Sequence, residues 1–109
     1  MNFKNKRFIT RGIGDTVNPY LQILLWGLID TMPSSKDYLQ VFELSDSAGK
    51  VKVIHTQENP EYRREYLWDA PVFCGKIFVI DDGDHSTMLL AEEYSFERRI
   101  FKYGKRVYL

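Results

Sequence analysis

One short segment holds the densest group of potential metal ligands in the sequence, because Asp81, Asp82, Asp84 and His85 surround Gly83. Hard cations such as Ca²⁺ bind several oxygen atoms of this kind. The spacing nevertheless lacks the alternating acidic pattern of a calcium loop. A glycine among aspartates is also typical of a turn, in which carboxylates accept hydrogen bonds from nearby backbone N–H groups. We therefore expect a turn here rather than a metal site.

Other residue types that support catalysis occur singly. Cys74 has no local nucleophile motif around it, and we expect a small buried thiol at the entrance of a strand. His55 shares a predicted strand face with Val51 and Val53, which indicates a core histidine satisfied by one hydrogen bond. The Gly-Ile-Gly segment at 12–14 is only part of a dinucleotide fingerprint, and we expect a loop there. We predict no catalytic residue, no cofactor and no metal, and favour a non-catalytic protein over an enzyme.

The C-terminal segment combines basic and aromatic residues. Nucleobases stack on aromatic rings, and Lys and Arg pair with phosphates, so this segment is a candidate nucleic-acid interface. Against it, residues 13–94 contain fourteen acidic and six basic residues, and the resulting negative charge would repel phosphate. The simpler interpretation is that the basic ends of the chain neutralise this acidic surface. The candidate phosphate-binding residues are Arg98, Arg99, Lys102, Lys105 and Arg106.

The strongest helix signal covers Asn18–Met32. Asn18 can cap the first turn, and Pro19 suits the first helical position, where a missing N–H costs nothing. Pro33 ends the pattern. Apolar residues recur at the spacing of one helical face and predict the side that packs in the core. These residues are Leu21, Leu24, Leu25, Leu28, Ile29 and Met32.

Ile23 and Trp26 point away from this apolar stripe, on a face of the helix that should be polar. Tryptophan is enriched at the energetic centres of protein interfaces. We expect the pair to be covered either by the chain's own tail or by another chain, and take Ile23 and Trp26 as candidate partner-binding residues. Gly27 lies beside them and would be tolerated if another backbone approached closely.

The rest of the chain alternates with the period of β-strands. Residues 87–93 fit either a strand or a short helix, and we favour the strand. Because the leucine stripe needs an apolar surface to cover, the expected fold is α+β, a mainly antiparallel sheet of four to six strands with one principal helix packed on one face. The expected strands are Arg7–Thr10, Tyr38–Ser45, Lys50–Gln57, Tyr62–Trp68, Lys76–Ile80 and Thr87–Glu93.

Length and composition indicate one self-sufficient domain, residues 1–109. Hydrophobic residues make up 44% of the chain, which suits a folded protein, and the formal net charge is zero. We find no apolar run of the roughly 20 residues that span a bilayer and no secretory signal. A single cysteine gives no internal disulfide. The expected location is the cytoplasm, without a membrane partner.

Three stretches of the sequence resemble a known family. They are KRFITRG at 6–12, YLQVFEL at 38–44, and IFVIDDGD at 77–84, which continues into STMLLAEEY. The family is the domain of unknown function 960, found in staphylococci and other Firmicutes, and the resemblance covers most of residues 6–94. It implies a bacterial cytoplasmic protein of about this length, and no activity or site residue, because the family has none assigned.

The sequence thus favours a small interaction or regulatory module that acts through protein–protein contacts, with a homodimer as one possible form. A nucleic-acid-binding accessory protein that uses the basic C-terminal segment is the alternative. The two hypotheses place the site on different parts of the chain.

Overall fold

The computed structural model describes residues 2–95, 100–101 and 106–108, with side chains up to Tyr94. Strands predominate, and two helices follow the first strand. The elements are β1 (Lys6–Thr10), α1 (Arg11–Thr16), α2 (Pro19–Asp30), β2 (Leu39–Ser47), β3 (Lys50–Gln57), β4 (Tyr62–Trp68), β5 (Gly75–Asp81), β6 (His85–Leu90), the 3₁₀ turn η1 (Ala91–Glu93), β7 (Tyr94–Ser95), β8 (Ile100–Phe101) and β9 (Arg106–Tyr108).

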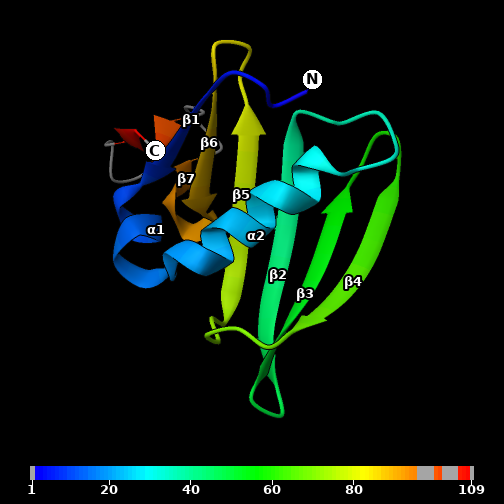
Figure 1. Cartoon of the computed structure of the whole chain (residues 1–109). Coiled ribbons are helices and arrows are strands. Elements are labelled where there is room, and N and C mark those ends of the chain that lie inside the picture. Colours follow the sequence, from blue (N-terminus) through cyan, green and yellow to red (C-terminus); the bar gives the residue numbers. More distant parts are fainter. Residues whose placement is uncertain (1, 96–99, 102–105, 109) are drawn as a thin grey trace.

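The main sheet has seven strands within the described residues, in the order β4-β3-β2-β5-β6-β1-β9 (Figure 1). Neighbouring strands are antiparallel except β1 and β6, which run parallel. The α+β prediction is confirmed in this coarse form. The sheet is mixed because β1 runs parallel to β6. It is wider than predicted because β9, a strand that was not predicted in the basic segment, pairs with the outer edge of β1.

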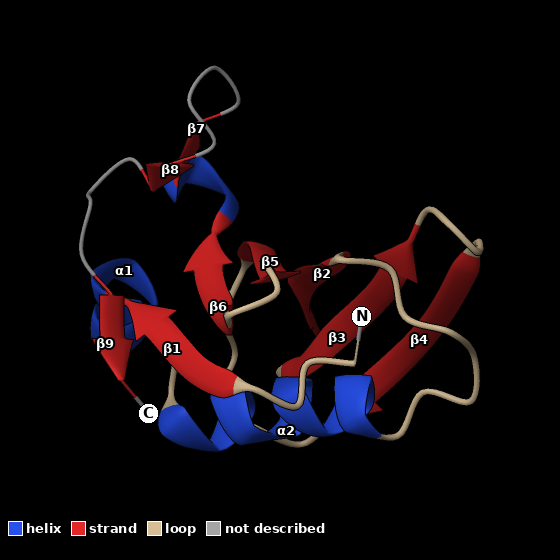
Figure 2. Cartoon of the chain, turned by 90° about the horizontal axis from the view of Figure 1, so that it is seen from above, coloured by secondary structure: helices blue, strands red, loops and turns tan. Residues whose placement is uncertain are grey.

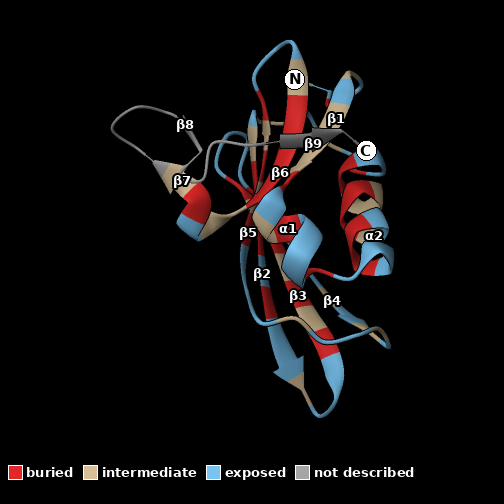
Figure 3. Ribbon diagram, turned by 90° about the vertical axis from the view of Figure 1, so that its left-hand side faces the viewer, coloured by how far each residue is buried: buried red, intermediate tan, exposed pale blue. Residues whose placement is uncertain are grey.

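Helix α2 crosses one face of the sheet (Figure 2). Asn18 caps it as predicted, since its side-chain oxygen accepts from the backbone N–H of Tyr20 at 2.8 Å. Leu21, Leu25 and Ile29 are fully buried on its inner side. Figure 3 shows that the buried positions lie on this side of α2 and along the strands beneath it. The sheet side of the core consists of Phe42, Leu44, Val51, Val53, Ile77, Val79 and Met88.

The β2–β3 hairpin turns at Ala48 and Gly49. Both residues have positive φ, 53° and 86°. Two such residues form the tight turn whose twist matches that of paired strands, so the strands predicted at Tyr38–Ser45 and Lys50–Gln57 pair as an antiparallel hairpin. The favoured strand after Gly83 is also present as β6, although its last three predicted residues form η1 instead.

The loop predicted at residues 12–14 is wrong, because this segment belongs to α1. The Thr10 hydroxyl accepts from the backbone N–H of Ile13 and caps the helix. The buried carboxylate of Glu93 then accepts from the Thr10 hydroxyl at 2.6 Å, from the Gly12 N–H at 3.2 Å and from the Leu90 N–H at 2.8 Å. These bonds stabilise a helix that its two glycines disfavour.

The Glu93 carboxylate approaches Gly12 closely. A Cβ atom at position 12 would lie 2.7 Å from the Glu93 Cδ, whereas one at Gly14 would meet only the Ile9 Cδ1 at 3.6 Å. Gly12→Ala should displace the carboxylate and lower the free energy of unfolding by about 2 kcal/mol, because buried hydrogen bonds are lost. Gly14→Ala, the matched control, should be neutral or slightly stabilising. Urea unfolding of both variants measures this, and equal values would contradict it.

Candidate functional site

A groove of about 490 Å³ runs between β1 and α2. Ile23, Trp26 and Gly27 form its helical side together with Asp30, and the segment from Asn5 to Arg7 forms the other. The structure thus brings both predicted partner-binding residues to one surface. Their roles there differ, because Trp26 forms part of the covered wall and Ile23 projects into solvent.

Trp26 is covered, as expected, and only 6% of this residue is accessible. The Arg7 guanidinium lies over the indole at 4.6 Å from the ring centroid. Arg7 is fixed there by hydrogen bonds to the Phe3 carbonyl at 3.1 and 3.2 Å and to the Asp30 carboxylate. Among the described residues the cover therefore comes from the N-terminal segment, which the parallel pairing of β1 with β6 brings over the helix. The expected cover by the tail falls on residues whose side chains are not described.

Ile23 and Tyr20 are the large exposed residues of α2, with 67% and 56% of their surfaces accessible. Gly27 follows on the same side of the helix, and a Cβ atom at this position would have no atom of another described residue within 4 Å outside its chain neighbours and the helix backbone. Among the described residues no backbone of this chain approaches Gly27, and approach by another chain stays a prediction. This outer face of α2, formed by Tyr20, Ile23 and Gly27, is apolar, and the described residues leave Tyr20 and Ile23 exposed on it.

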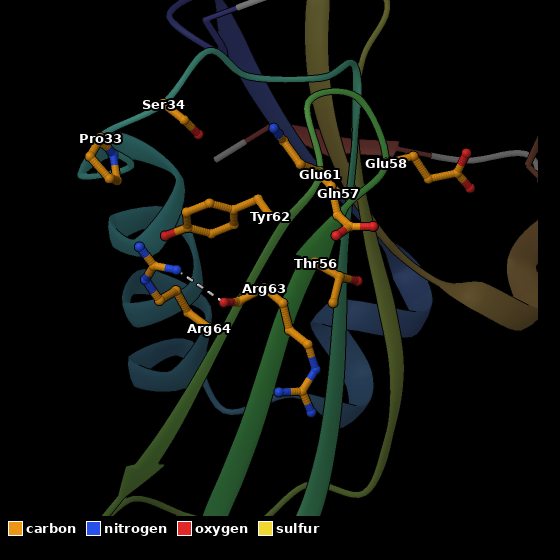
Figure 4. Close-up of a pocket in the computed structure, with 9 residues that line it drawn as sticks. All are labelled: Pro33, Ser34, Thr56, Gln57, Glu58, Glu61, Tyr62, Arg63 and Arg64. Carbon is orange, nitrogen blue, oxygen red and sulfur yellow. Dashed lines mark hydrogen bonds between the residues drawn. The ribbon is translucent and has the colours of Figure 1, made fainter.

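A second groove of about 790 Å³ lies at the end of the β3–β4 hairpin (Figure 4). Tyr62 and Arg64 lie next to each other near Pro33, which follows the end of α2. The Arg64 guanidinium stands over the Tyr62 ring at 4.9 Å. Sequence analysis missed this groove. The only signal was the alternation of aromatic and basic residues along β4, which places Tyr62 and Arg64 on one face.

A buried polar network lies under this second groove. His55 Nε2 contacts the Gln40 Oε1 at 2.7 Å, and the Gln40 amide donates to the Gln57 Oε1 at 2.7 Å. Gln57 in turn donates to the carbonyls of Ser35 at 2.9 Å and Pro60 at 2.7 Å. It therefore joins the loop after α2 to the β3–β4 turn, so that the two sides of the groove are fixed relative to each other.

His55 is confirmed as a core histidine with one hydrogen bond. It is fully buried, stacked on Phe42 at 4.4 Å and edge-on to Tyr62 at 5.3 Å. Because Gln40 uses its amide N–H groups on other acceptors, its oxygen faces His55 Nε2, which must carry the proton. The Nδ1 atom is buried without a hydrogen-bond partner. Burial lowers the pKa of His55 to about 4.

The aspartate segment forms the predicted turn. The Asp82 carboxylate accepts from the backbone N–H groups of Asp84 at 3.2 Å and His85 at 3.0 Å. Asp81 is instead buried at the end of β5. Burial acts to raise the pKa of Asp81, but hydrogen bonds from the Gly83 N–H, the Asn5 amide and the Phe3 N–H outweigh it and hold this pKa below its usual value. Among the residues with described side chains, no group of three or more His, Cys, Asp or Glu is placed to bind a metal.

The comparisons with known proteins identify the family. The family model described as staphylococcal protein of unknown function (DUF960) matches residues 6–93. The chain belongs to this family. A crystal structure of a protein of unknown function from Enterococcus faecalis is similar to it, with a TM-score of 0.80 and 25% sequence identity over 87% of this chain and 97% of that one. No curated protein matches the sequence.

DUF960 membership confirms the resemblance seen in residues 6–94 and brings no activity with it. None of the helices in the described part is long and apolar enough to cross a membrane. The predicted burial of Cys74 is wrong, because this residue is exposed in the segment before β5. Of the candidate nucleic-acid residues, Arg98, Arg99, Lys102 and Lys105 lie outside the described residues. Arg106 begins β9, where its backbone pairs with Thr10.

Protonation of His55 should make the stability of this DUF960 protein pH-dependent. Between about pH 6.5 and 4 the unfolded chain binds a proton at His55 that the folded chain does not, so the free energy of unfolding falls as the pH falls, by up to about 1.4 kcal/mol per unit. His55→Gln retains an N–H donor for Gln40 and cannot titrate. Urea unfolding from pH 7.5 to 4.5 should show a shallower decline for this variant. Parallel curves would contradict the prediction.

Proposed function

We propose that this protein is a small non-catalytic module of the cytoplasm that binds another protein chain through the outer face of α2. The observation that carries the proposal is the joint exposure of Tyr20 and Ile23 on the helix, beside the groove that contains Trp26. Aromatic and aliphatic residues in such a patch, rimmed by charged groups, are typical of interaction surfaces. Lys6 and Asp30 supply those charges on the two sides of the groove.

The open helix surface at Gly27 supports the same proposal. Glycine in a helix interior costs roughly 1 kcal/mol relative to alanine, and nothing in the described chain occupies the space above it. A partner that packs directly on the helix backbone would account for a glycine at this position. The arrangement also leaves the fold independent of the partner, because Leu21, Leu25 and Ile29 bury the opposite side of α2.

A nucleic-acid interface in the basic C-terminal segment stays a prediction. Its phosphate-binding candidates are outside the described residues or have no described side chain. No specific observation favours it over the face of α2.

Ile23→Asp should weaken association at least tenfold without unfolding the protein, because a charge then occupies the centre of the apolar face. Val72→Asp, at another exposed apolar residue, is the matched control and should have no effect. Sedimentation velocity over a concentration series measures self-association. A photo-crosslinking residue in place of Tyr20 detects a different partner in the cell. A monomer that forms no crosslink, or equal behaviour of both aspartate variants, would contradict the proposed function.

Gly27→Ala should raise the free energy of unfolding by about 1 kcal/mol, since helix propensity improves and the added methyl group meets no described atom. Gly27→Leu should preserve the fold yet weaken association, because its side chain fills the space that the partner needs. Thermal unfolding and sedimentation, performed on both variants, separate the two effects. Unchanged association of Gly27→Leu would show that no partner packs on this part of the helix.

A further inference from the structure

Strand β4 forms one edge of the main sheet. It pairs with β3 along all seven of its residues, and among the described residues no strand lies on its other side. Edge strands are usually protected by prolines, bulges, short length or charged side chains. β4 contains neither proline nor glycine, and 56% of Leu67 is exposed on it. Its outer edge is thus unpaired among the described residues and open to an additional strand, although Arg63, Arg64 and Glu65 place charges along it and the Arg63 carbonyl already accepts from the Arg64 guanidinium.

The charges along this edge are unequally compensated. Glu65 accepts from Arg63 at 2.5 Å and lies 3.4 Å from the Lys52 Nζ. Arg64 instead donates to the Arg63 carbonyl at 3.1 Å and stands over the Tyr62 ring, and it forms no ion pair with the described residues. Glu58 and Glu61 line the same groove, but neither forms an ion pair with Arg64 among the described residues. Arg64 is thus an exposed cation in a defined position, with donors left over for a carboxylate.

The groove beside Arg64 is already formed. Gln57 fixes its two sides through the Ser35 and Pro60 carbonyls, and Tyr62 is buried against His55. Preformed sites cost less ordering on binding, which favours an incoming extended chain. Strand addition to a sheet edge supplies affinity through main-chain hydrogen bonds and specificity through adjacent side-chain sites.

We propose that the β4 edge binds an extended segment of another protein by strand addition, with an acidic side chain of that segment paired to Arg64. A second copy of this chain fits less well. The antiparallel register that pairs all seven residues of two β4 strands places Glu65 opposite Glu65 of the second copy, and like charges directly opposite destabilise a sheet. The β4 edge is a different surface from the outer face of α2, so the proposal does not depend on the function proposed above.

The experiment begins with selection from a phage-displayed library of random octapeptides on the intact wild-type protein. Enriched peptides should carry Asp or Glu among residues of high β-propensity. Anisotropy of the best peptide, synthesised with a fluorescent label, then measures affinity. Arg64→Gln should weaken binding at least tenfold, Arg64→Lys should retain most of it, and Arg64→Glu should favour a peptide in which Lys replaces the acidic residue.

Lys50→Gln is the control, because it removes one positive charge from an exposed residue of β3 outside the groove and should change affinity less than twofold. In ¹⁵N spectra the bound peptide should shift the amide resonances of residues 62–68. Failure to enrich peptides, enrichment without acidic residues, equal effects of Arg64→Gln and Lys50→Gln, or shifts confined to α2 would each overturn the proposal. So would a dimer formed through β4. Ile23→Asp changes the proposed α2 interface and should leave peptide binding to β4 unchanged. The peptide measurements therefore test the β4 edge separately from the α2 interface.

Discussion

The burial of one side of α2 against the sheet is the interaction on which the other features of this protein depend. Leu21, Leu25 and Ile29 lie fully buried over the central strands, and their periodicity determines which side of the helix faces outward. Apolar burial of this kind is the main favourable contribution to folding. Because it fixes the rotation of α2 about its axis, it also places Ile23 in solvent and Trp26 at the border, where Arg7 of β1 covers it.

Polar interactions then define the borders of this core. At one end, Arg7 covers Trp26 and pairs with Asp30. At the other, Gln57 and Gln40 connect two loops to His55. Buried polar groups that are hydrogen-bonded specify a unique arrangement, whereas unpaired ones are costly. The unpaired Nδ1 of His55 and Nε1 of Trp26 are the buried side-chain atoms in the described structure that bear this cost.

Local patterns predicted most of the elements, because their signals come from neighbours in the sequence. The bounds of β3 and β4 agree with the predicted ranges, and Asn18 caps α2. The errors concern contacts between distant residues. Helix α1 forms despite two glycines because Glu93 supports it, and the cover over Trp26 depends on β1 pairing with β6. The periodic patterns of helices and strands carry no information about such contacts.

The candidate sites also divide into features that depend on neighbours in the sequence and features that depend on contacts between distant residues. Helical spacing placed Ile23 on the outer side of α2, and strand alternation placed His55 in the core. The groove beside Tyr62 and Arg64 combines the end of α2 with the β3–β4 turn. These parts meet through the Gln57 hydrogen bonds and through the bond that the Asn59 N–H donates to the Asp37 carboxylate, all of which involve residues of the loop after α2 and of the β3–β4 hairpin. The geometry of this groove could therefore not be predicted from sequence patterns.

The placement of β1 beside β6 has a consequence for folding during synthesis. Phe3 bonds to Asp81, β1 pairs with residues 85–88, and the Thr10 hydroxyl bonds to Glu93. During synthesis, residues 3–10 therefore lack these partners until residues 81–93 have left the ribosome. The β2–β3–β4 meander, which is built from local hairpins, can pair earlier. Contacts over long sequence separations slow folding and prolong the exposure of unpaired strands. Although β1 is synthesised before the other strands, it can pair with the edge of β6 only after β6 has formed, and this edge is unpaired until then.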